Sequence, residues 1–199
     1  MLKLLTKIPR KINLAFSGGV DSLAAAHFLA KNHNVTLLHF NHGCQYSDMI
    51  EEQCRERAES LSLPIVVGSM DNEPRKKGQS LEDYWRRSRY RFLRSFNEQF
   101  ITCHHADDAV ETWIFSSLHG EGKLIPMSDA LVLRPFLITE KSTLVSYAER
   151  HNLVPVDDPY NRMYDLTRNY IRANIIPHAY KVNPGLIKMI RKKYLAITQ

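Results

Sequence analysis

Residues 17–22, SGGVDS, follow the apolar run INLAF and precede the helix-forming run LAAAHFLAK. Two glycines between a strand and a helix bring backbone N–H groups and the positive helix end to one point, which suits an anion such as phosphate. The string is neither a Walker P-loop nor GxGxxG. Asp21 would repel a phosphate unless a cation lay between them, which indicates Mg²⁺. The alternative is a plain tight turn in which Asp21 or Ser22 caps the helix.

The elements that must position this turn are predicted to alternate between strands and helices. Apolar, β-branched-rich strands are predicted at residues 11–16, 35–40, 64–70 and 99–103. Helical patterns follow them at residues 21–32, 47–61, 80–97 and 107–118. This alternation indicates an α/β fold with a Rossmann-like, doubly wound, mostly parallel sheet that is covered by helices on both faces.

Ligands of such sheets bind beyond the carboxyl ends of the strands, so the segments after the strands are candidates for a site. All four are polar: SGGVDS, NHG at 41–43, MDNEPRKKGQS at 70–80 and HHADD at 104–108. We expect the third to be a mobile, basic surface loop. In the fourth, Asp108 and Glu111 share one helix face, where a carboxylate pair suits a cationic amine. The alternative is that these acids only stabilise the helix dipole.

His104 and His105 stand beside two aspartates, but a zinc site needs three or four converging ligands. The three cysteines include no CxxC pair and do not supply them, so we expect the histidines to support other groups or to face phosphates. Scattered cysteines indicate free thiols in a reducing cytoplasm. Nothing resembles a signal peptide, and no run reaches the roughly 18 apolar residues of a membrane span. We therefore expect a cytoplasmic protein that does not enter a membrane.

The net charge of +6 is unevenly distributed along the chain. Residues 1–133 hold 16 Lys+Arg and 16 Asp+Glu, whereas residues 134–199 hold 11 and 5. A neutral body with a basic C-terminal part suggests a polyanionic partner, with nucleic acid first; the alternative is that the basic helices are only solvated faces. Turn-forming residues near 151–165 suggest a boundary. We predict a catalytic domain at 1–155 and a short basic helical extension at 156–199, with two helices separated by Pro184-Gly185.

SGGVDS resembles the PP-loop of the N-type ATP pyrophosphatases, which cleave ATP to AMP and pyrophosphate while adenylating a substrate. Seven further segments occur in the order seen in the tRNA(Ile)-lysidine synthetase family. They are HFNHG (39–43), RRSRYRFL (86–93), TCHHADDAVET (102–112), LHGEG (118–122), RPFL (134–137), DDPYN (157–161) and TRNYIRANIIP (167–177). The resemblance covers about residues 12–177 and implies the PP-loop ATPase fold.

The resemblance also implies a reaction. That family uses ATP and Mg²⁺ to join the ε-amine of free lysine to C2 of the wobble cytidine in an isoleucine tRNA with a CAU anticodon. The C2 oxygen is first adenylated, with release of pyrophosphate, and the amine then displaces AMP. Positioning and neutralisation of charge carry the first step.

Roles for individual residues follow from the same resemblance and from the basic tail. ATP binding is implied for Ser17, Gly18, Gly19, Val20, Asp21, Ser22, Asn41, His42, Gly43 and His105, with Asp21 also a candidate Mg²⁺ ligand. Catalysis is implied for Asp21, Asp108, Glu111 and Arg86, and lysine binding for Asp108 and Glu111. Contacts with tRNA or phosphate are expected for Arg89, Arg134, Arg168, Arg172, Lys188, Arg191 and Lys192.

Several readings stay open. Arg168 and Arg172 would instead close the catalytic body if they paired with Asp157 or Asp158. Asp107 would support the acidic pair or the metal. The aromatic residues of the third helix fit a core better than a base-stacking platform: Tyr84, Trp85, Tyr90 and Phe92.

The sequence departs from the family at Cys103, where a small residue is usual, and at His119, where Arg is frequent. Many members carry further C-terminal domains that grip tRNA, whereas this chain stops at Gln199. We therefore expect a short form that docks tRNA through its basic helices, as a homodimer or with a helper protein, or that acts on a different tRNA. Two other functions are weighed: a tRNA-thiolating enzyme, for which catalytic cysteines are lacking, and a non-catalytic nucleotide or tRNA binder, which the intact acidic residues disfavour.

Overall fold

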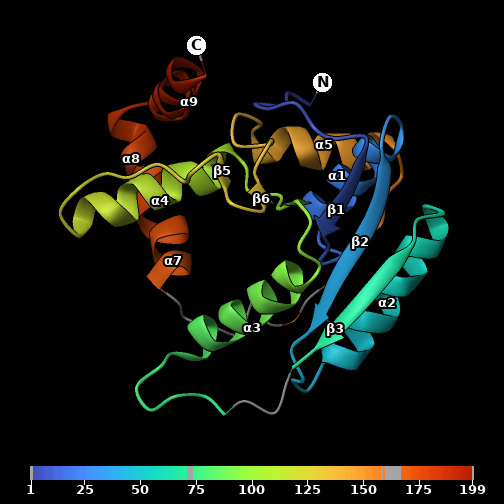
Figure 1. Cartoon of the computed structure of the whole chain (residues 1–199). Helices are drawn as coiled ribbons and strands as arrows, with labels where there is room; N and C mark the ends of the chain where they lie inside the picture. Colours follow the sequence, from blue (N-terminus) through green and yellow to red (C-terminus); the bar gives the residue numbers. More distant parts are fainter. Residues whose placement is uncertain (1, 71–73, 158, 160–166, 199) are drawn as a thin grey trace.

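The computed structural model of the chain describes residues 2–70, 74–157, 159 and 167–198. Its centre is a six-stranded sheet with the order β3-β2-β1-β4-β6-β5 (Figure 1). The strands are β1 Lys11–Ala15, β2 Asn34–Asn41, β3 Ile65–Ser69, β4 Phe100–Ile101, β5 Ser128–Asp129 and β6 Val132–Leu133. All neighbours run parallel except β5 and β6. The doubly wound, mostly parallel sheet predicted from the sequence is therefore confirmed.

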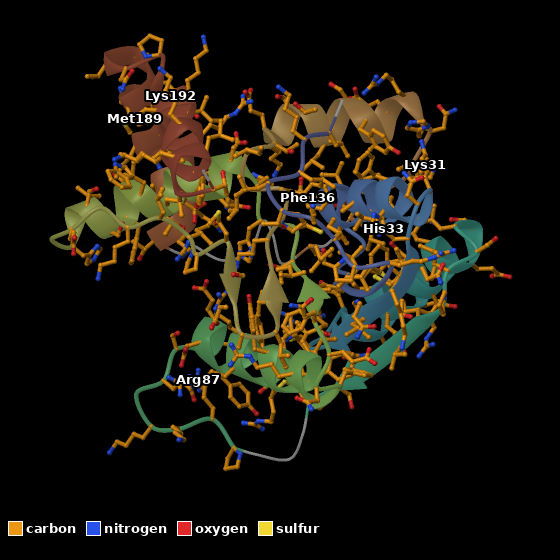
Figure 2. All side chains as sticks on the ribbon, turned by 45° about the horizontal axis from the view of Figure 1, so that its top comes forward. Lys31, His33, Arg87, Phe136, Met189 and Lys192 are labelled. Carbon is orange, nitrogen blue, oxygen red and sulfur yellow. The ribbon has the colours of Figure 1, made fainter. Side chains whose placement is uncertain are left out.

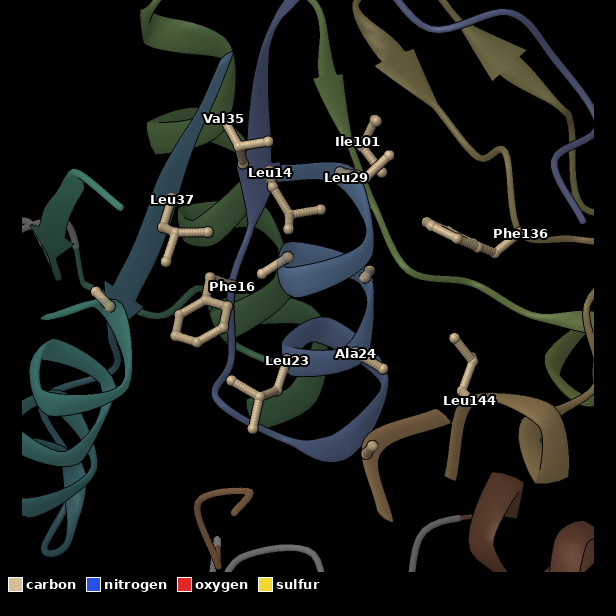
Figure 3. Packing of buried hydrophobic residues seen from close by; sticks show 14 of the residues in the cluster. Leu14, Phe16, Leu23, Ala24, Leu29, Val35, Leu37, Ile101, Phe136 and Leu144 are labelled. Carbon is tan, nitrogen blue, oxygen red and sulfur yellow. The ribbon is translucent and has the colours of Figure 1, made fainter. Parts of the chain in front are cut away.

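One face of the sheet is covered by α1 (Val20–Ala30), α2 (Ser47–Ser60) and α5 (Lys141–Arg150). The period of two along β1 places Leu14 on this face, and its register brings it between Leu37 of β2 and Ile101 of β4. The alanines and leucines of α1 pack against these strands (Figure 3). Because the strands β1, β2 and β4 are held by this packing, the positions of the segments that follow them are fixed.

The opposite face is covered by α3 (Leu81–Ser95), while α4 (Ala106–Leu118) packs with the C-terminal helices. Leu93 of α3 packs with Leu38, Phe100 and Val132 in a second apolar cluster. A Cβ on Gly68 of β3 would lie 2.3 Å from the ring of Phe92, so glycine lets α3 approach that strand closely. The helix begins at Ser80, whose side chain accepts a hydrogen bond from the Asp83 N–H.

The C-terminal part forms α7 (Thr167–Tyr170), a π-helical turn η1 (Ile171–Ile175), α8 (Ile176–Val182) and α9 (Leu186–Ile197). The first three are continuous, and the break before α9 confirms the separation predicted at Pro184-Gly185. Ile190 and Tyr194 of α9 pack with Val110 of α4 in a third apolar cluster. Figure 1 shows these helices lying beside α4, so the basic part is attached to the body through an apolar interface.

Some elements differ from the sequence prediction. The strand predicted at 99–103 is confined to β4 at 100–101, and neither α5 nor β5 was predicted. Residues 71–73 of the predicted surface loop lie outside the described residues, while residues 74–78 are exposed. Among the described residues no helix is both long and apolar enough to cross a membrane.

Candidate functional site

A cavity of about 530 Å³ lies at the carboxyl ends of β1, β2 and β4, with α3 forming one wall. Strand order reverses between β1 and β4, which is where ligands bind in doubly wound sheets. Its lining includes a subset of the residues predicted from the sequence: Ser17, Asp21, Ser22, Asn41, His42, Arg89 and Asp108. The structure therefore brings three of the four polar segments to one place.

The SGGVDS turn is held by its own two serines. The Ser22 hydroxyl donates to the Gly19 carbonyl at 3.0 Å, and its oxygen lies 3.2 Å from the Ser17 hydroxyl. No side chain caps α1, and first-turn N–H groups such as those of Val20 and Asp21 have no helical acceptor. The turn thus presents uncapped donors to the cavity edge, and the capping role considered for Asp21 or Ser22 is wrong.

Gly18 is required by the backbone and by its neighbours. Its φ is +75°, and a Cβ there would lie 2.6 Å from the Val156 side chain and 2.8 Å from the Cys54 sulfur. The Val156 N–H donates to the Gly18 carbonyl at 3.0 Å. Cys54 of α2 and the segment at Val156 therefore hold the turn from behind, which the sequence pattern did not reveal.

Asp21 points one carboxylate oxygen into this arrangement without a partner. Its Oδ1 is buried and has no hydrogen bond within the described part of the chain, while Oδ2 lies 3.7 Å from His105 Nε2. A carboxylate oxygen without a hydrogen-bond partner is the kind of ligand that Mg²⁺ prefers. No group of three or more His, Cys, Asp or Glu that could hold a metal occurs among the described residues. Asp21 would therefore share such a cation with a bound phosphate.

His105 lies behind the cavity and faces three carboxylates. Its ring nitrogens lie 3.7, 3.5 and 3.5 Å from Asp21, Asp107 and Asp108. Burial alone would lower the pKa of His105, but hydrogen bonds to Asp107 and Asp21 and the charges of Asp108 and Asp21 raise it to about 9. Nδ1 also lies 3.4 Å from the Asp108 N–H, a contact that needs a neutral ring. That contact is long, so we assign the imidazolium at neutral pH.

Asp107 and Asp108 have different environments. The Asp108 carboxylate accepts from the His105 backbone N–H at 3.0 Å and lines the cavity, and burial raises its pKa. The Asp107 carboxylate accepts from the Lys141 N–H at 2.7 Å, at the start of α5. Burial would raise the pKa of Asp107, but its bonds to His105 and Lys141 lower it. Asp107 therefore links α4 to α5 and supports His105.

Glu111 is 2% exposed and binds two arginines of the C-terminal helices. Arg168 Nη1 donates to its Oε1 at 2.9 Å, and Arg172 donates to Oε2 through Nε at 3.0 Å and Nη2 at 2.5 Å. Arg172 Nη2 also lies 3.6 Å from Asp108 Oδ1. Glu111 does not line the cavity. Of the pairing partners considered for these arginines, Asp158 lies outside the described residues.

Asn41 at the end of β2 uses its amide within the protein. Its NH₂ group donates to Asp48 and Glu51 at 2.9 Å each, and its oxygen accepts from the Gly43 N–H at 2.8 Å. Burial and the Arg89 charge lower the pKa of His42, which follows Asn41, to about 4. The cavity wall at β2 is therefore neutral and held in shape by α2.

His104 and Cys103 line the cavity at the end of β4. His104 Nδ1 lies 2.8 Å from the Thr102 hydroxyl. Burial, followed by the charge of Arg134, lowers the pKa of His104 to about 3, and burial raises that of the Cys103 thiol. Both side chains are therefore uncharged at neutral pH.

The two arginines of α3 that were predicted to belong to the site lie in different surroundings. Arg89 lines the cavity, and burial lowers its pKa. Arg86 is exposed, does not line the cavity, and lies with its guanidinium 4.8 Å from the Tyr90 ring centre.

The residues predicted to contact tRNA also differ in how far they are exposed. Arg134 is 6% exposed and donates to the Pro126 carbonyl at 2.8 Å, so its side chain lies inside the protein. Arg191 pairs with Glu140 at 2.8 Å. Lys188 and Lys192 are exposed on α9, and Figure 2 shows Lys192 on the outer side of that helix.

Fold and site define an α/β protein of the doubly wound class, with an uncapped glycine turn at the topological switch point. The sequence profile described as "PP-loop domain" matches residues 2–179. The chain belongs to this PP-loop family.

Two curated relatives are named tRNA(Ile)-lysidine synthase. That of Pseudomonas fluorescens is 34% identical over 82% of this chain and 40% of its own length. That of Persephonella marina is 32% identical over 88% and 43%. The chain thus spans about two fifths of their length.

Two solved structures share the fold. NMN synthetase from Francisella tularensis has a TM-score of 0.54 at 13% identity, and the match covers 96% of this chain and 87% of that one. The NH3-dependent NAD synthetase from Campylobacter jejuni has a TM-score of 0.54 at 15% identity, with 96% and 86% covered. At such identities the likeness concerns the fold alone.

Proposed function

We propose that this protein joins free lysine to C2 of the wobble cytidine of an isoleucine tRNA with a CAU anticodon, at the expense of ATP. One observation carries the proposal: a single cavity brings the uncapped SGGVDS turn and Asp21 together with Asp108, and His105 connects the two carboxylates. The names of the curated relatives support the same reaction.

ATP would bind with its phosphates at the turn of residues 17–22, where backbone N–H groups and the end of α1 favour anions. Mg²⁺ held by Asp21 would neutralise phosphate charge and ease departure of pyrophosphate. Arg89 adds a positive charge from α3. The C2 oxygen of cytidine attacks the α-phosphorus, the bond to pyrophosphate breaks, and an adenylated cytidine results.

Lysine would bind with its amine toward Asp108, the acidic side chain of α4 that lines the cavity. Burial raises the pKa of Asp108, which makes its carboxylate a better acceptor for the proton that the ammonium must lose. The free amine then forms the bond to C2 as the C2–O bond breaks and AMP leaves. Glu111 would join Asp108 in binding the amine if Arg172 yields its place, because Arg172 now contacts both carboxylates.

The tRNA backbone would contact the C-terminal helices. No acidic residue occurs at positions 167–199, whereas seven are Lys or Arg. Arg168, Arg172 and Arg191 are engaged by Glu111 and Glu140, whereas the three lysines of α9 are exposed: Lys188, Lys192 and Lys193. Such contacts position a nucleic acid without reading its sequence.

The test is incorporation of labelled lysine into isoleucine tRNA, with Asp21→Asn and the surface substitution Asp129→Asn as matched variants. We expect Asp21→Asn to reduce the rate by about 100-fold or more, because an amide is a poor Mg²⁺ ligand. Asp129→Asn, in an exposed pair with Arg94, should keep the wild-type rate. Near-normal incorporation by Asp21→Asn, or transfer of sulfur instead of lysine, would contradict the proposal.

A further inference from the structure

The aromatic residues of α3 have different surroundings. Phe92 packs against Phe40 with ring centres 5.7 Å apart, and Tyr90 packs edge-on against Phe100 at 6.2 Å. For these two the expectation of a core position holds. Tyr90 also lines the cavity, as does Trp85, whose ring centre lies 5.5 Å from that of His42.

The cavity wall around Trp85 is suited to a flat, uncharged ligand. Phe40, Ile50 and Leu93 contribute apolar surface to the same lining. The amide of Asn41 is fully engaged with Asp48, Glu51 and Gly43, so it offers no free donor there. A nucleobase would find an aromatic face at this end, and the positive charge of Arg89 lies one turn further along α3.

We propose that Trp85 is the stacking surface for the adenine ring of ATP and thereby sets the preference for the nucleotide. This inference rests on the proposed use of ATP. The order of the strands favours adenine over the cytidine of tRNA. Trp85 contacts His42 at the end of β2, on one side of the glycine turn at β1, while Asp108 follows β4 on the other side. The cytidine has to meet both the α-phosphate and the amine, so it belongs on the β4 side.

The chain has two tryptophans, which makes the inference directly measurable. Trp113 lies under α9, where the Lys193 ammonium is 4.8 Å from its ring centre, and it does not line the cavity. In a Trp113→Phe variant the emission comes from Trp85 alone. We expect Mg-ATP, AMP and adenosine to change this emission, whereas pyrophosphate should leave it unchanged. The reverse single-tryptophan variant, Trp85→Phe, should show little response to any of them.

Affinity for ATP, measured by calorimetry without tRNA or lysine, provides the second readout. Trp85→Leu keeps apolar volume but removes the aromatic face, and we expect ATP binding to weaken by about 10-fold or more, with Trp85→Phe close to wild type. Binding of pyrophosphate should be the same in all three proteins, which also shows that the variant cavity is intact.

Each outcome decides the inference. If ATP binds but Trp85 emission and the affinity of Trp85→Leu are unchanged, the role of Trp85 is wrong while the proposed function stands. If CMP or an anticodon stem-loop changes the emission and ATP does not, Trp85 contacts the tRNA base instead. If wild-type protein binds no ATP, the inference and the proposed function both fail.

Discussion

At the scale of single residues, the glycine turn illustrates how a site depends on what lies behind it. Gly18 has a positive φ and also contacts Val156 and Cys54 so closely that no Cβ fits. Gly78 has a similar φ of +79°, but nothing lies within 4 Å of its Cβ position. A comparison of the two glycines therefore distinguishes the cost of backbone strain from the cost of steric exclusion.

We predict that Gly18→Ala destabilises the protein by several kcal/mol, because Val156 and Cys54 must move as well as the backbone. Gly78→Ala should cost only about 1 kcal/mol, the left-handed penalty alone. Urea unfolding of both variants measures the difference, and ATP affinity should fall only in Gly18→Ala. Equal destabilisation by the two substitutions would show that Val156 and Cys54 do not constrain the turn.

The chemistry of several residues was accessible from the sequence, and that of others was not. SGGVDS and HHADD follow strands, so their meeting at one edge of the sheet is a consequence of parallel topology. The ion pairs of Glu111 could not be predicted in this way, because Glu111 is 57 residues from Arg168 and no local pattern joins them. Similarly, Trp85 and Phe92 lie on one helix, and only the packing of α3 shows which of them faces the cavity.

At the scale of elements, α5 and β5 were missed for physical reasons. KSTLVSYAER has β-branched residues and no side-chain cap of its own; its first turn is instead held by Asp107, 34 residues away. β5 has only two residues and is defined by its antiparallel pairing with β6. The long, periodic elements α2 and α3 were predicted to within two residues at either end because burial there follows the sequence period.

The attachment of α7 and η1 to α4 depends on the Glu111 carboxylate. We predict that Glu111→Gln destabilises the protein by about 1–3 kcal/mol, since two arginines lose a charged acceptor. The arginines are themselves trypsin sites, so cleavage after Arg168 and Arg172 should become faster in this variant. Glu121→Gln, at an exposed position, serves as the control. Unchanged cleavage in Glu111→Gln would show that the apolar contacts alone hold these helices.

The exposed cations of α9 give a prediction for tRNA binding. Lys188→Ala and Lys192→Ala should each weaken binding and lower the slope of log K against log salt by roughly 1, because each removes about one phosphate contact. Lys11→Ala, which loses an exposed pair with Glu98, should leave the slope unchanged. Filter binding at salt concentrations of about 50 to 200 mM measures this slope, because the effect of salt on binding is large in that range. An unchanged slope in both variants would show that Lys188 and Lys192 of α9 do not contact the tRNA phosphates.

At the scale of the whole molecule, the buried histidines make stability depend on pH. Burial lowers the pKa of His42 to about 4 and that of His104 to about 3, against about 6.5 in an unfolded chain. The unfolded state therefore binds more protons below pH 6.5, and the contribution of these neutral histidines is lost as pH falls from 6.5 toward 4 and 3. His105 acts in the opposite direction: its raised pKa adds stability that is complete below 6.5 and lost as pH rises through about 9.

We predict that the free energy of unfolding falls by about 2 kcal/mol for each of His42 and His104 between pH 7.5 and 5, offset by roughly 1 kcal/mol from His105. Urea unfolding at several pH values measures the net loss. His104→Gln removes one titrating group, so its free energy of unfolding should fall less steeply with acid than that of the wild type. A His104→Gln profile parallel to that of the wild type would mean that the pKa of His104 is the same in the folded and the unfolded protein, so that burial does not keep its ring neutral in acid.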